Sequence, residues 1–375
     1  MYAYRISGIL RAGSSFLVLS VILCLLCTSC ARDMTEMQTV SPDNRRFTLI
    51  NYNVAGLPKL FGNQAEDVGA NQEKIGAQLA MREFDIVAVQ EDFGYHSDLL
   101  VGLGDAYPAR TIHSGGVPGG DGLNVYSRFA LYNETRTPWS AAYGIIEDGA
   151  DEMTPKGILY TLIELEDGVY LDFYDIHADA YGDAGSTAAR EVQFRQLADL
   201  LKSRTIDRPI IITGDFNTSL HHGNDSGLYE NLMAECSLDD AWITLFNNGN
   251  TDDFSEHHDS AALWDSIEKV LFRSGGGVEL TPASFAYEYL TDDDGVSLSD
   301  HPSVVCSFTY SLSETFTPTE EAMTVPGRNH LAGAMNKIRY IAVDLWKIFS
   351  NFDQLWGYMK PSVDAFFGKL QSLFS

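Results

Sequence analysis

The chain has few positively charged residues, and this limits which ligands its surface can attract. Among 375 residues there are 25 lysines and arginines against 52 aspartates and glutamates, so the formal net charge is −27 at pH 7. Such a surface repels polyphosphates at long range and gives no electrostatic footprint for nucleic acid. A nucleic-acid substrate is not excluded, because divalent cations can neutralise a local site.

Long apolar runs and internal repeats are also lacking. The apolar segment 16–26 follows two arginines and is too short to favour a membrane-spanning helix, which is typical of a signal peptide. It ends at Cys27-Thr28-Ser29-Cys30, which resembles a bacterial lipoprotein processing site. We predict a signal peptide in residues 1–30 and an exported, membrane-anchored lipoprotein lipidated at Cys30. Since Cys27 stands where leucine is usual, plain signal-peptidase cleavage to a periplasmic or extracellular protein is the alternative.

Cysteine is scarce in the remaining chain. After such cleavage only Cys236 and Cys306 belong to the folded part. In an oxidising compartment they could form a disulfide. Two buried, unpaired thiols are the equally compatible alternative.

What is present is a globular α/β pattern, in which 45% of the residues are hydrophobic. A polar linker over 31–45 precedes an alternating strand at 47–54, a helix at 71–81 and a buried strand at 84–90, and this order argues for an α/β protein. Further expected elements are a strand at 123–128, a hairpin at 158–165 and 169–177, a helix at 186–203, an isoleucine-rich strand at 209–213, a helix at 228–236, and strands at 266–272 and 303–310.

Polar residues recur at or just beyond the ends of successive apolar strands. Each has a simpler structural reading as a turn former, helix cap or satisfied core histidine. Their ordered recurrence favours a shared site, since strand ends at one sheet edge are where α/β folds build sites. The residues are Asn53, Glu91, His177, Asp215 with Asn217, and Asp300 with His301.

This ordered set resembles the endonuclease/exonuclease/phosphatase superfamily, the DNase I-like fold that includes neutral sphingomyelinases. The matching segments are Asn51-Tyr52-Asn53, Val89-Gln90-Glu91, Tyr174-Asp175-Ile176-His177, Gly214-Asp215-Phe216-Asn217 and Ser299-Asp300-His301-Pro302, with support from Ser127-Arg128 and Lys156-Gly157. The resemblance implies a four-layered αββα sandwich over residues 46–310, in which two packed mixed β-sheets are flanked by helices.

The resemblance also implies a metal site. Glu91 corresponds to the principal carboxylate ligand of a Mg²⁺ ion, with Asn53 beside it and Asp300 as a further ligand. Oxygen ligands suit this ion, which keeps several waters and grips a substrate phosphate. Mn²⁺ or Ca²⁺ are alternatives.

The remaining roles are implied in the same way. His301 corresponds to the general base or phosphate partner, and His177 to the phosphate binder or general acid, while Asp215 and Asn217 position the nucleophile or phosphate. The family orients its base with an aspartate from the penultimate strand. The matching residue here is Glu268, one methylene longer, and Asp265 is the alternative partner of His301.

The C-terminal part differs in kind. We expect a linker at 311–330 and an amphipathic helical extension at 331–375, which is interrupted at Pro361. It packs on the protein or lies on a lipid surface. The prediction for the whole chain is a monomeric, secreted or lipid-anchored Mg²⁺-dependent phosphodiesterase acting on a phospholipid or sphingomyelin. An exported nuclease of the same fold and a non-catalytic surface adhesin or interaction protein are the alternatives.

Overall fold

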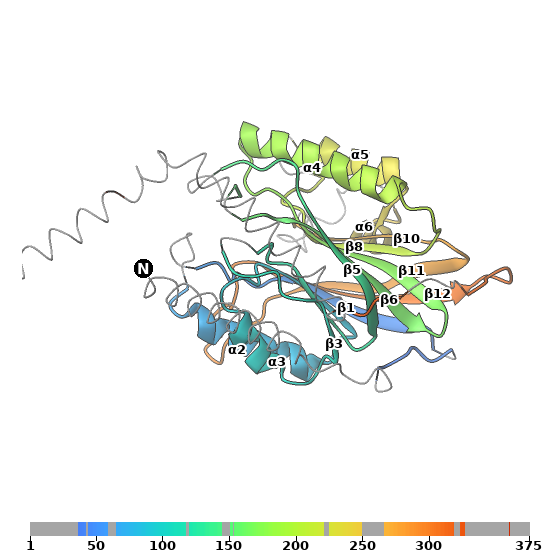
Figure 1. Ribbon diagram of the computed structural model, residues 1–375, viewed down its shortest axis with the longest axis horizontal. Coiled ribbons are helices and arrows are strands. Elements are labelled where there is room, and N and C mark those ends of the chain that lie inside the picture. The colour runs from blue at the N-terminus through green and yellow to red at the C-terminus, as the bar shows by residue number, and fades with distance from the viewer. Residues whose placement is uncertain are drawn as a thin grey trace, which may run out of the picture.

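Two six-stranded β-sheets form the centre of the computed structural model (Figure 1). The structure describes residues 37–42, 44–58, 65–117, 120–144, 151–152, 154–220, 225–249, 266–318, 323–326 and 360. The first sheet has the strand order β11-β12-β1-β2-β4-β3, and the second has the order β5-β6-β7-β8-β10-β9. Their bounds are β1 Arg46–Asn53, β2 Ile86–Gln90, β3 Ala109–Arg110, β4 Asn124–Ser127, β5 Ala130–Pro138, β6 Gly157–Glu166, β7 Val169–His177, β8 Ile210–Asp215, β9 Asp239–Asp240, β10 Glu268–Arg273, β11 Val278–Glu288 and β12 Ser303–Leu312.

Helices cover the two outer faces of this sheet pair. Figure 1 shows α4 and α5 over the second sheet and α2 and α3 over the first, which gives four layers. The helices are α2 Val68–Arg82, α3 His96–Leu103, α4 Ala184–Lys202, α5 Ser226–Cys236 and α6 Ala241–Phe246. The expected αββα sandwich of two mixed sheets is therefore confirmed.

Each sheet contains one parallel pair joined by a helix. In the first sheet, β1 and β2 are parallel and α2 connects them; in the second, β7 and β8 are parallel and α4 connects them. Parallel strands need such a crossover because their starts lie at the same end. The carboxyl ends of each pair therefore meet at one edge of each sheet.

Both faces of β1 are buried, which explains its position in the sandwich. Leu49 packs in the core between the sheets, whereas Ile50 and Tyr52 pack on the other face among residues of α2 and α3. Successive side chains of a strand point to opposite faces. Alternation along β1 thus joins the inter-sheet core to the helical layer.

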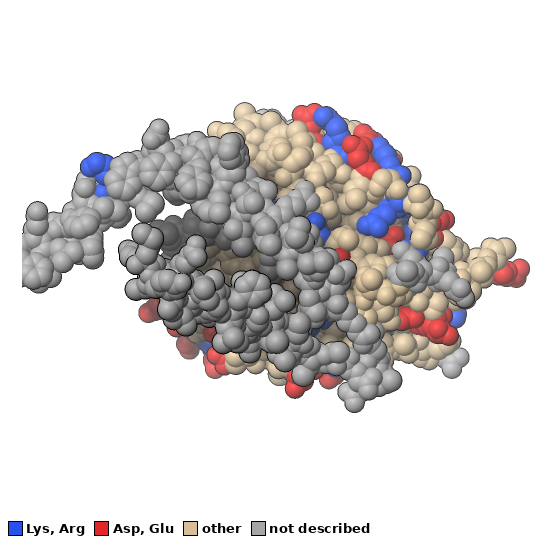
Figure 2. Space-filling model, viewed as in Figure 1, with Lys and Arg blue, Asp and Glu red and all other residues tan. Residues whose placement is uncertain are grey.

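The outer surface of α4 and α5 is mixed in charge. Figure 2 shows basic and acidic atoms intermingled along the edge where Figure 1 draws these two helices. Lys202 of α4 pairs with Glu235 of α5 at 2.6 Å, and Arg195 pairs with Glu191 at 2.8 Å. Exposed pairs of this kind contribute little stability.

Both cysteines in the described part of the body, Cys236 and Cys306, are free and buried, so they form no disulfide with each other. Described residues outside the predicted body also contact it. The backbone N–H of Val40 donates to the Leu165 carbonyl, and the Thr324 carbonyl accepts from the backbone N–H of Asn133. None of the helices in the described ranges is long and apolar enough to cross a membrane. The predicted signal peptide and almost all of the predicted C-terminal extension lie outside these ranges.

Candidate active site

The carboxyl ends of the two parallel strand pairs converge between the sheets. Asn53 ends β1 opposite Gln90 of β2, and His177 ends β7 opposite Asp215 of β8. The ends of the two sheets are tied together because Asn51 donates its amide to the Gly214 carbonyl at 3.3 Å. Strand register within each sheet and this contact between the sheets therefore bring polar side chains from four strands together.

Asn53 lies at the centre of this cluster and is fully buried. Its Nδ2 donates to Glu91 Oε1 and to Asp215 Oδ2, both at 3.1 Å, and lies 3.4 Å from His301 Nε2. Its Oδ1 accepts from the Ala55 backbone at 3.0 Å. One amide thus links both carboxylates and a histidine across the two sheets.

His301 is held by Glu268, the residue that the sequence matched to an aspartate in the family. Glu268 Oε1 accepts from His301 Nδ1 at 2.5 Å, and Ser266 donates to the other carboxylate oxygen. Although burial lowers the pKa of His301, the Glu268 hydrogen bond and the charges of Asp215 and Glu268 raise it to about 10. The glutamate therefore reaches the histidine, while Asp265 lies outside the described residues.

Asp215 joins the two strands beside it. It is paired in register with His177 on one side and with Glu268 on the other. Its Oδ2 lies 3.4 Å from His177 Nε2, and its Oδ1 accepts from the Asn217 backbone at 3.0 Å. Burial raises its pKa, and the charge of His301 opposes that rise.

His177 is buried at 1% exposure. Burial lowers its pKa well below the ordinary range, and the nearby charges of Lys156 and His301 lower it further. A neutral imidazole of this kind is a poor proton source. Between the two predicted roles, the environment therefore favours a hydrogen-bond donor over a general acid.

Asn217 lies next to this group. It adopts a left-handed backbone with φ of 50°, and its Nδ2 donates to the Ala178 carbonyl at 3.1 Å. Glu91 is likewise left-handed, at φ of 60°. Residues other than glycine are uncommon in this region, and such strain often marks functional sites.

The donor set fits a hard divalent cation. Burial raises the pKa of Glu91, while the charges of His301 and Lys156 lower it. Asp215, Glu268 and His301 form a group whose potential ligand atoms lie within 4.8 Å of one another. Carboxylate oxygens suit Mg²⁺, and Glu91 Oε1 and Asp215 Oδ2 both lie 3.1 Å from Asn53 Nδ2, so these two carboxylates could hold it, whereas Asn53 Oδ1 accepts from the Ala55 backbone.

Asp300 is the one predicted site residue that the structure does not bring into the cluster. Its side chain is 81% exposed, and its Oδ1 lies 3.9 Å from His301 Nε2. The other seven, namely Asn53, Glu91, His177, Asp215, Asn217, Glu268 and His301, lie together. Asp300 therefore lies at the exposed edge of the cluster, and its role as a further metal ligand stays a prediction.

Sequence reasoning noted Lys156 only as a supporting match, yet it is part of the site. It is 7% exposed, pairs with Asp151, and donates to the Ala178 carbonyl at 3.3 Å. Ser299, which sequence reasoning assigned no role, donates to the Asn53 carbonyl at 2.7 Å and accepts from the His301 backbone at 3.2 Å. The Ser-Asp-His motif itself was the signal for Ser299.

Comparison with known families agrees with this geometry. A model of the Endonuclease/Exonuclease/phosphatase family matches residues 50–301. The chain belongs to this family.

The curated relatives are more specific. The sphingomyelinase of Mycobacterium tuberculosis is 28% identical over 285 residues, which cover 74% of this chain and 54% of that protein. The sphingomyelinase of Mycobacterium bovis matches to the same extent. The chain thus spans about half the length of these relatives.

Solved structures share the fold. A mutant beta toxin from Staphylococcus aureus with bound magnesium ions matches with a TM-score of 0.51 and 15% identity, over 72% of this chain and 99% of that one. A humanized D. rerio TDP2 also matches with a TM-score of 0.51, at 16% identity, over 71% of this chain and 99% of that one. At these identities the likeness concerns the fold alone.

Proposed function

We propose that this protein is a divalent-cation-dependent phosphodiesterase whose substrate is a phospholipid or sphingomyelin. One observation carries the proposal: two carboxylates and the Nε2 of His301 surround a single buried amide, Asn53 Nδ2. Phosphodiester hydrolysis needs positive charge on the phosphate, a base for water, and donors for the equatorial oxygens. The cluster supplies the base and the donors and provides ligands for a cation.

The residues suggest a division of labour. A divalent cation, when bound, would supply the positive charge that the phosphate requires. Glu268 accepts from Nδ1 of His301, so the reacting nitrogen is Nε2. In the unprotonated form of His301, whose share grows as the pH rises toward its pKa of about 10, Nε2 takes a proton from water as the water oxygen bonds to phosphorus and the ester bond to the alcohol breaks. The proton is returned to the departing alkoxide.

A cavity beside the cluster supports a cationic headgroup. It has a volume of 360 Å³, and its charged lining consists of Asp151, Glu152, Asp179 and one cation, Lys156. Burial raises the pKa of Asp179 to about 7, and the charge of Asp151 adds to this. Three carboxylates around one ammonium favour a cation in the remaining space.

An aromatic wall completes this cavity. Trp139 lines it and donates its indole N–H to the His177 carbonyl at 2.6 Å, so the wall is tied to the phosphate-binding edge. Aromatic faces with carboxylates are the usual recognition surface for quaternary ammonium groups. The names of the curated relatives point the same way, since sphingomyelin is a choline phosphodiester. A nucleic acid would bring further negative charge to an acidic wall.

A substrate panel tests the proposal. The purified protein is assayed with Mg²⁺ and with EDTA on sphingomyelin, phosphatidylcholine, phosphatidylglycerol, plasmid DNA and a generic phosphodiester. We expect Mg²⁺-dependent hydrolysis of the choline lipids, which His301→Ala abolishes and the exposed control Lys202→Ala retains. Hydrolysis of plasmid DNA in preference to lipid would favour the nuclease, and inactivity on every substrate would favour the adhesin.

The headgroup cavity has its own test. Asp179→Asn is expected to reduce the preference for choline lipid over phosphatidylglycerol while keeping turnover of the generic phosphodiester. Because Asp179 ionises near pH 7, the preference should rise as the pH increases through 7 in the wild type and stay flat in the variant. An unchanged preference in the variant would remove this cavity from headgroup recognition.

A further inference from the structure

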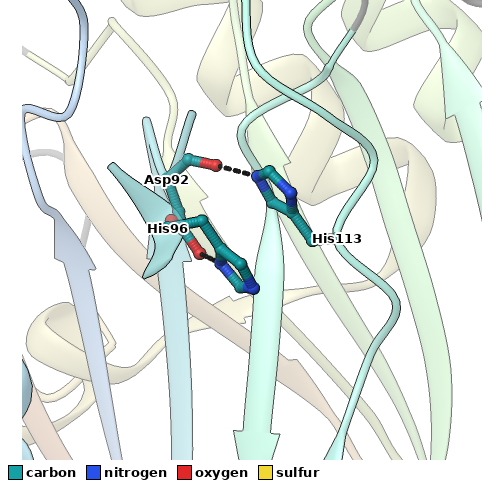
Figure 3. A group of neighbouring side chains, drawn as sticks. All are labelled: Asp92, His96 and His113. Carbon is teal, nitrogen blue, oxygen red and sulfur yellow. Dashed lines mark hydrogen bonds and ion pairs between the residues drawn. The ribbon is translucent and has the colours of Figure 1, made fainter. Parts of the chain in front are cut away.

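Asp92 directly follows Glu91, a proposed cation ligand, and has no part in the catalytic group. It is 1% exposed and lies just beyond the end of β2. Figure 3 shows its carboxylate and its backbone carbonyl each facing an imidazole, which belong to His96 and His113. His96 begins α3, and His113 lies between β3 and β4. Side chains from two other parts of the fold therefore converge on the residue beside Glu91.

The carboxylate of Asp92 is held by three donors. Its Oδ2 accepts from His96 Nδ1 and from the Tyr126 hydroxyl, both at 2.7 Å, and from Asn124 Nδ2 at 2.9 Å. Asn124 and Tyr126 belong to β4, the strand that pairs with β2. Removing an acceptor that buried donors share leaves those donors unsatisfied, which is costly. The side chain of Asp92 is therefore fixed to the first sheet and to α3.

The backbone of Asp92 is fixed as well. Its N–H donates to the Gly122 carbonyl at 2.9 Å, and its own carbonyl accepts from His113 Nε2 at 3.0 Å. A carbonyl oxygen carries no hydrogen, so Nε2 of His113 is the donor. The His113 ring stacks on the His96 ring, with centroids 3.9 Å apart. The two histidines therefore support each other while one holds the side chain of Asp92 and the other holds its backbone.

The backbone of Glu91 shows what this arrangement holds in place. Glu91 has a φ of 60°, in the left-handed region that residues with a side chain seldom adopt, and its Oε1 accepts from Asn53 Nδ2 at 3.1 Å. Because φ describes rotation about the N–Cα bond, a return to an ordinary negative φ would turn the Glu91 side chain relative to β2 and move its carboxylate away from Asn53. Such strain persists only where the surrounding structure enforces it. The neighbouring Asp92, fixed at its side chain and its backbone, enforces it here.

We propose that Asp92 is a positioning residue for the catalytic cation: with His96 and His113, it holds Glu91 in the left-handed conformation that directs its carboxylate to the cation site. The inference rests on the cation site of the proposed function and assigns a role to three residues that are not ligands themselves. Loss of a partner that orients a metal ligand weakens metal affinity about 10–100-fold. We expect an effect of this size when either the carboxylate of Asp92 or the imidazole of His113 is removed.

Calorimetric titration of the whole protein with Mn²⁺, without substrate, tests the positioning role. The cation site is the one that Glu91→Gln removes. Asp92→Ala and His113→Ala should each weaken it about 10–100-fold, whereas Asp92→Asn, whose amide oxygen can still accept, should weaken it less. The matched control is Asp240→Asn, since Asp240 is also buried and accepts from a tyrosine hydroxyl, that of Tyr229 at 2.6 Å, but lies at the start of α6. This control should keep wild-type affinity.

The pattern across the variants separates positioning from other causes. His113→Ala leaves the charge of Asp92 in place, so wild-type affinity in this variant would reduce the role of Asp92 to its charge and overturn the proposal. An equal loss in Asp240→Asn would attribute the effect to general damage of the fold and would also overturn it. Circular dichroism checks that each variant is folded.

Hydrogen exchange gives a readout that needs neither metal nor substrate. If Asp92→Ala does not fold, His113→Ala decides the question, because the His113 side chain is only half-buried. The Phe93 N–H donates to the Glu91 carbonyl at 2.9 Å, and it should exchange faster in metal-free His113→Ala than in the wild type. Unchanged exchange together with unchanged Mn²⁺ affinity would refute the inference alone. Failure to hydrolyse any phosphodiester would refute the proposed function and leave the cation and exchange results standing.

Discussion

Replacing Glu268 by glutamine tests the central dyad most directly, because it keeps side-chain length and removes the charge that holds His301. Despite its burial, the pKa of His301 is raised from 6.5 to about 10, with the Glu268 hydrogen bond as the first raising cause and the charge of Asp215 as the next. At about 1.4 kcal/mol for each pH unit, the folded protein favours the imidazolium by roughly 5 kcal/mol. Removing Glu268 should forfeit much of that preference.

The expected effect on catalysis follows from geometry. Glutamine keeps an amide oxygen that can accept from Nδ1–H but lacks the negative charge, and the next carboxylate near Nδ1 among the described residues, Asp215 Oδ2, is 3.9 Å away. General acid–base catalysis contributes about 10²–10⁴-fold, so Glu268→Gln should lower kcat within that range and change KM little. The control is Glu235→Gln, whose carboxylate is 56% exposed and pairs with Lys202 on the surface. This control should keep wild-type kinetics.

A second readout separates this explanation from general damage. In metal-free protein, NMR titration of His301 should show an apparent pKa near 10, which falls toward 6.5 in Glu268→Gln. A raised folded pKa contributes stability that is fully present below pH 6.5 and is lost as the pH rises through about 10. The free energy of unfolding should therefore decline from pH 7 to 10 in the wild type and decline less in the variant. Unchanged kcat together with unchanged His301 titration would refute the reasoning.

Three further predictions concern the fold and the ends of the chain. Gly214→Ala should lower the free energy of unfolding in urea by about 3 kcal/mol, because φ is 144° and an added Cβ would lie 1.9 Å from a backbone oxygen; a loss below about 1 kcal/mol would contradict this. In a bacterial host, Cys30→Ser should move the protein from the membrane fraction to the soluble exported fraction, and Cys27→Ser should not; equal behaviour of the two would remove the lipoprotein assignment. Deleting residues 331–375 should reduce co-sedimentation with anionic liposomes, and unchanged sedimentation would leave packing on the protein as their role.

The polar residues at the strand ends could be predicted because the local sequence determines where they lie. A buried strand followed by a polar residue places that residue at a sheet edge, whatever the rest of the chain does. This reasoning reached Asn53, His177 and Asp215 from adjacent residues alone. Their meeting across two sheets was implied only by the family resemblance, since no local pattern indicates which edges face each other.

Other features depend on packing that sequence patterns do not express. Strands β5 and β11 were missed, and β11 alternates buried with exposed positions but contains Pro282 and a register shift between Pro282 and Ser284. The family resemblance implied Asp300 as a further metal ligand, and no sequence pattern indicated that its side chain is 81% exposed. The stacked pair His96 and His113 was also missed, because the two residues are 17 positions apart in the sequence and only folding brings their rings together.

The acidity of the site leads to one physical conclusion about its substrate. A phosphodiester carries a negative charge, and the cluster already holds the carboxylates of Glu91, Asp215 and Glu268, with His301 and Lys156 as its nearby cations. Two like charges 4 Å apart repel by about 4 kcal/mol at an effective dielectric constant of 20. A chain with a net charge of −27 has no surplus of lysine or arginine to offset this. The same lack of positive charge weakens the case for nucleic acid. We therefore predict that phosphate binding needs an added metal cation, so EDTA should abolish substrate binding as well as turnover.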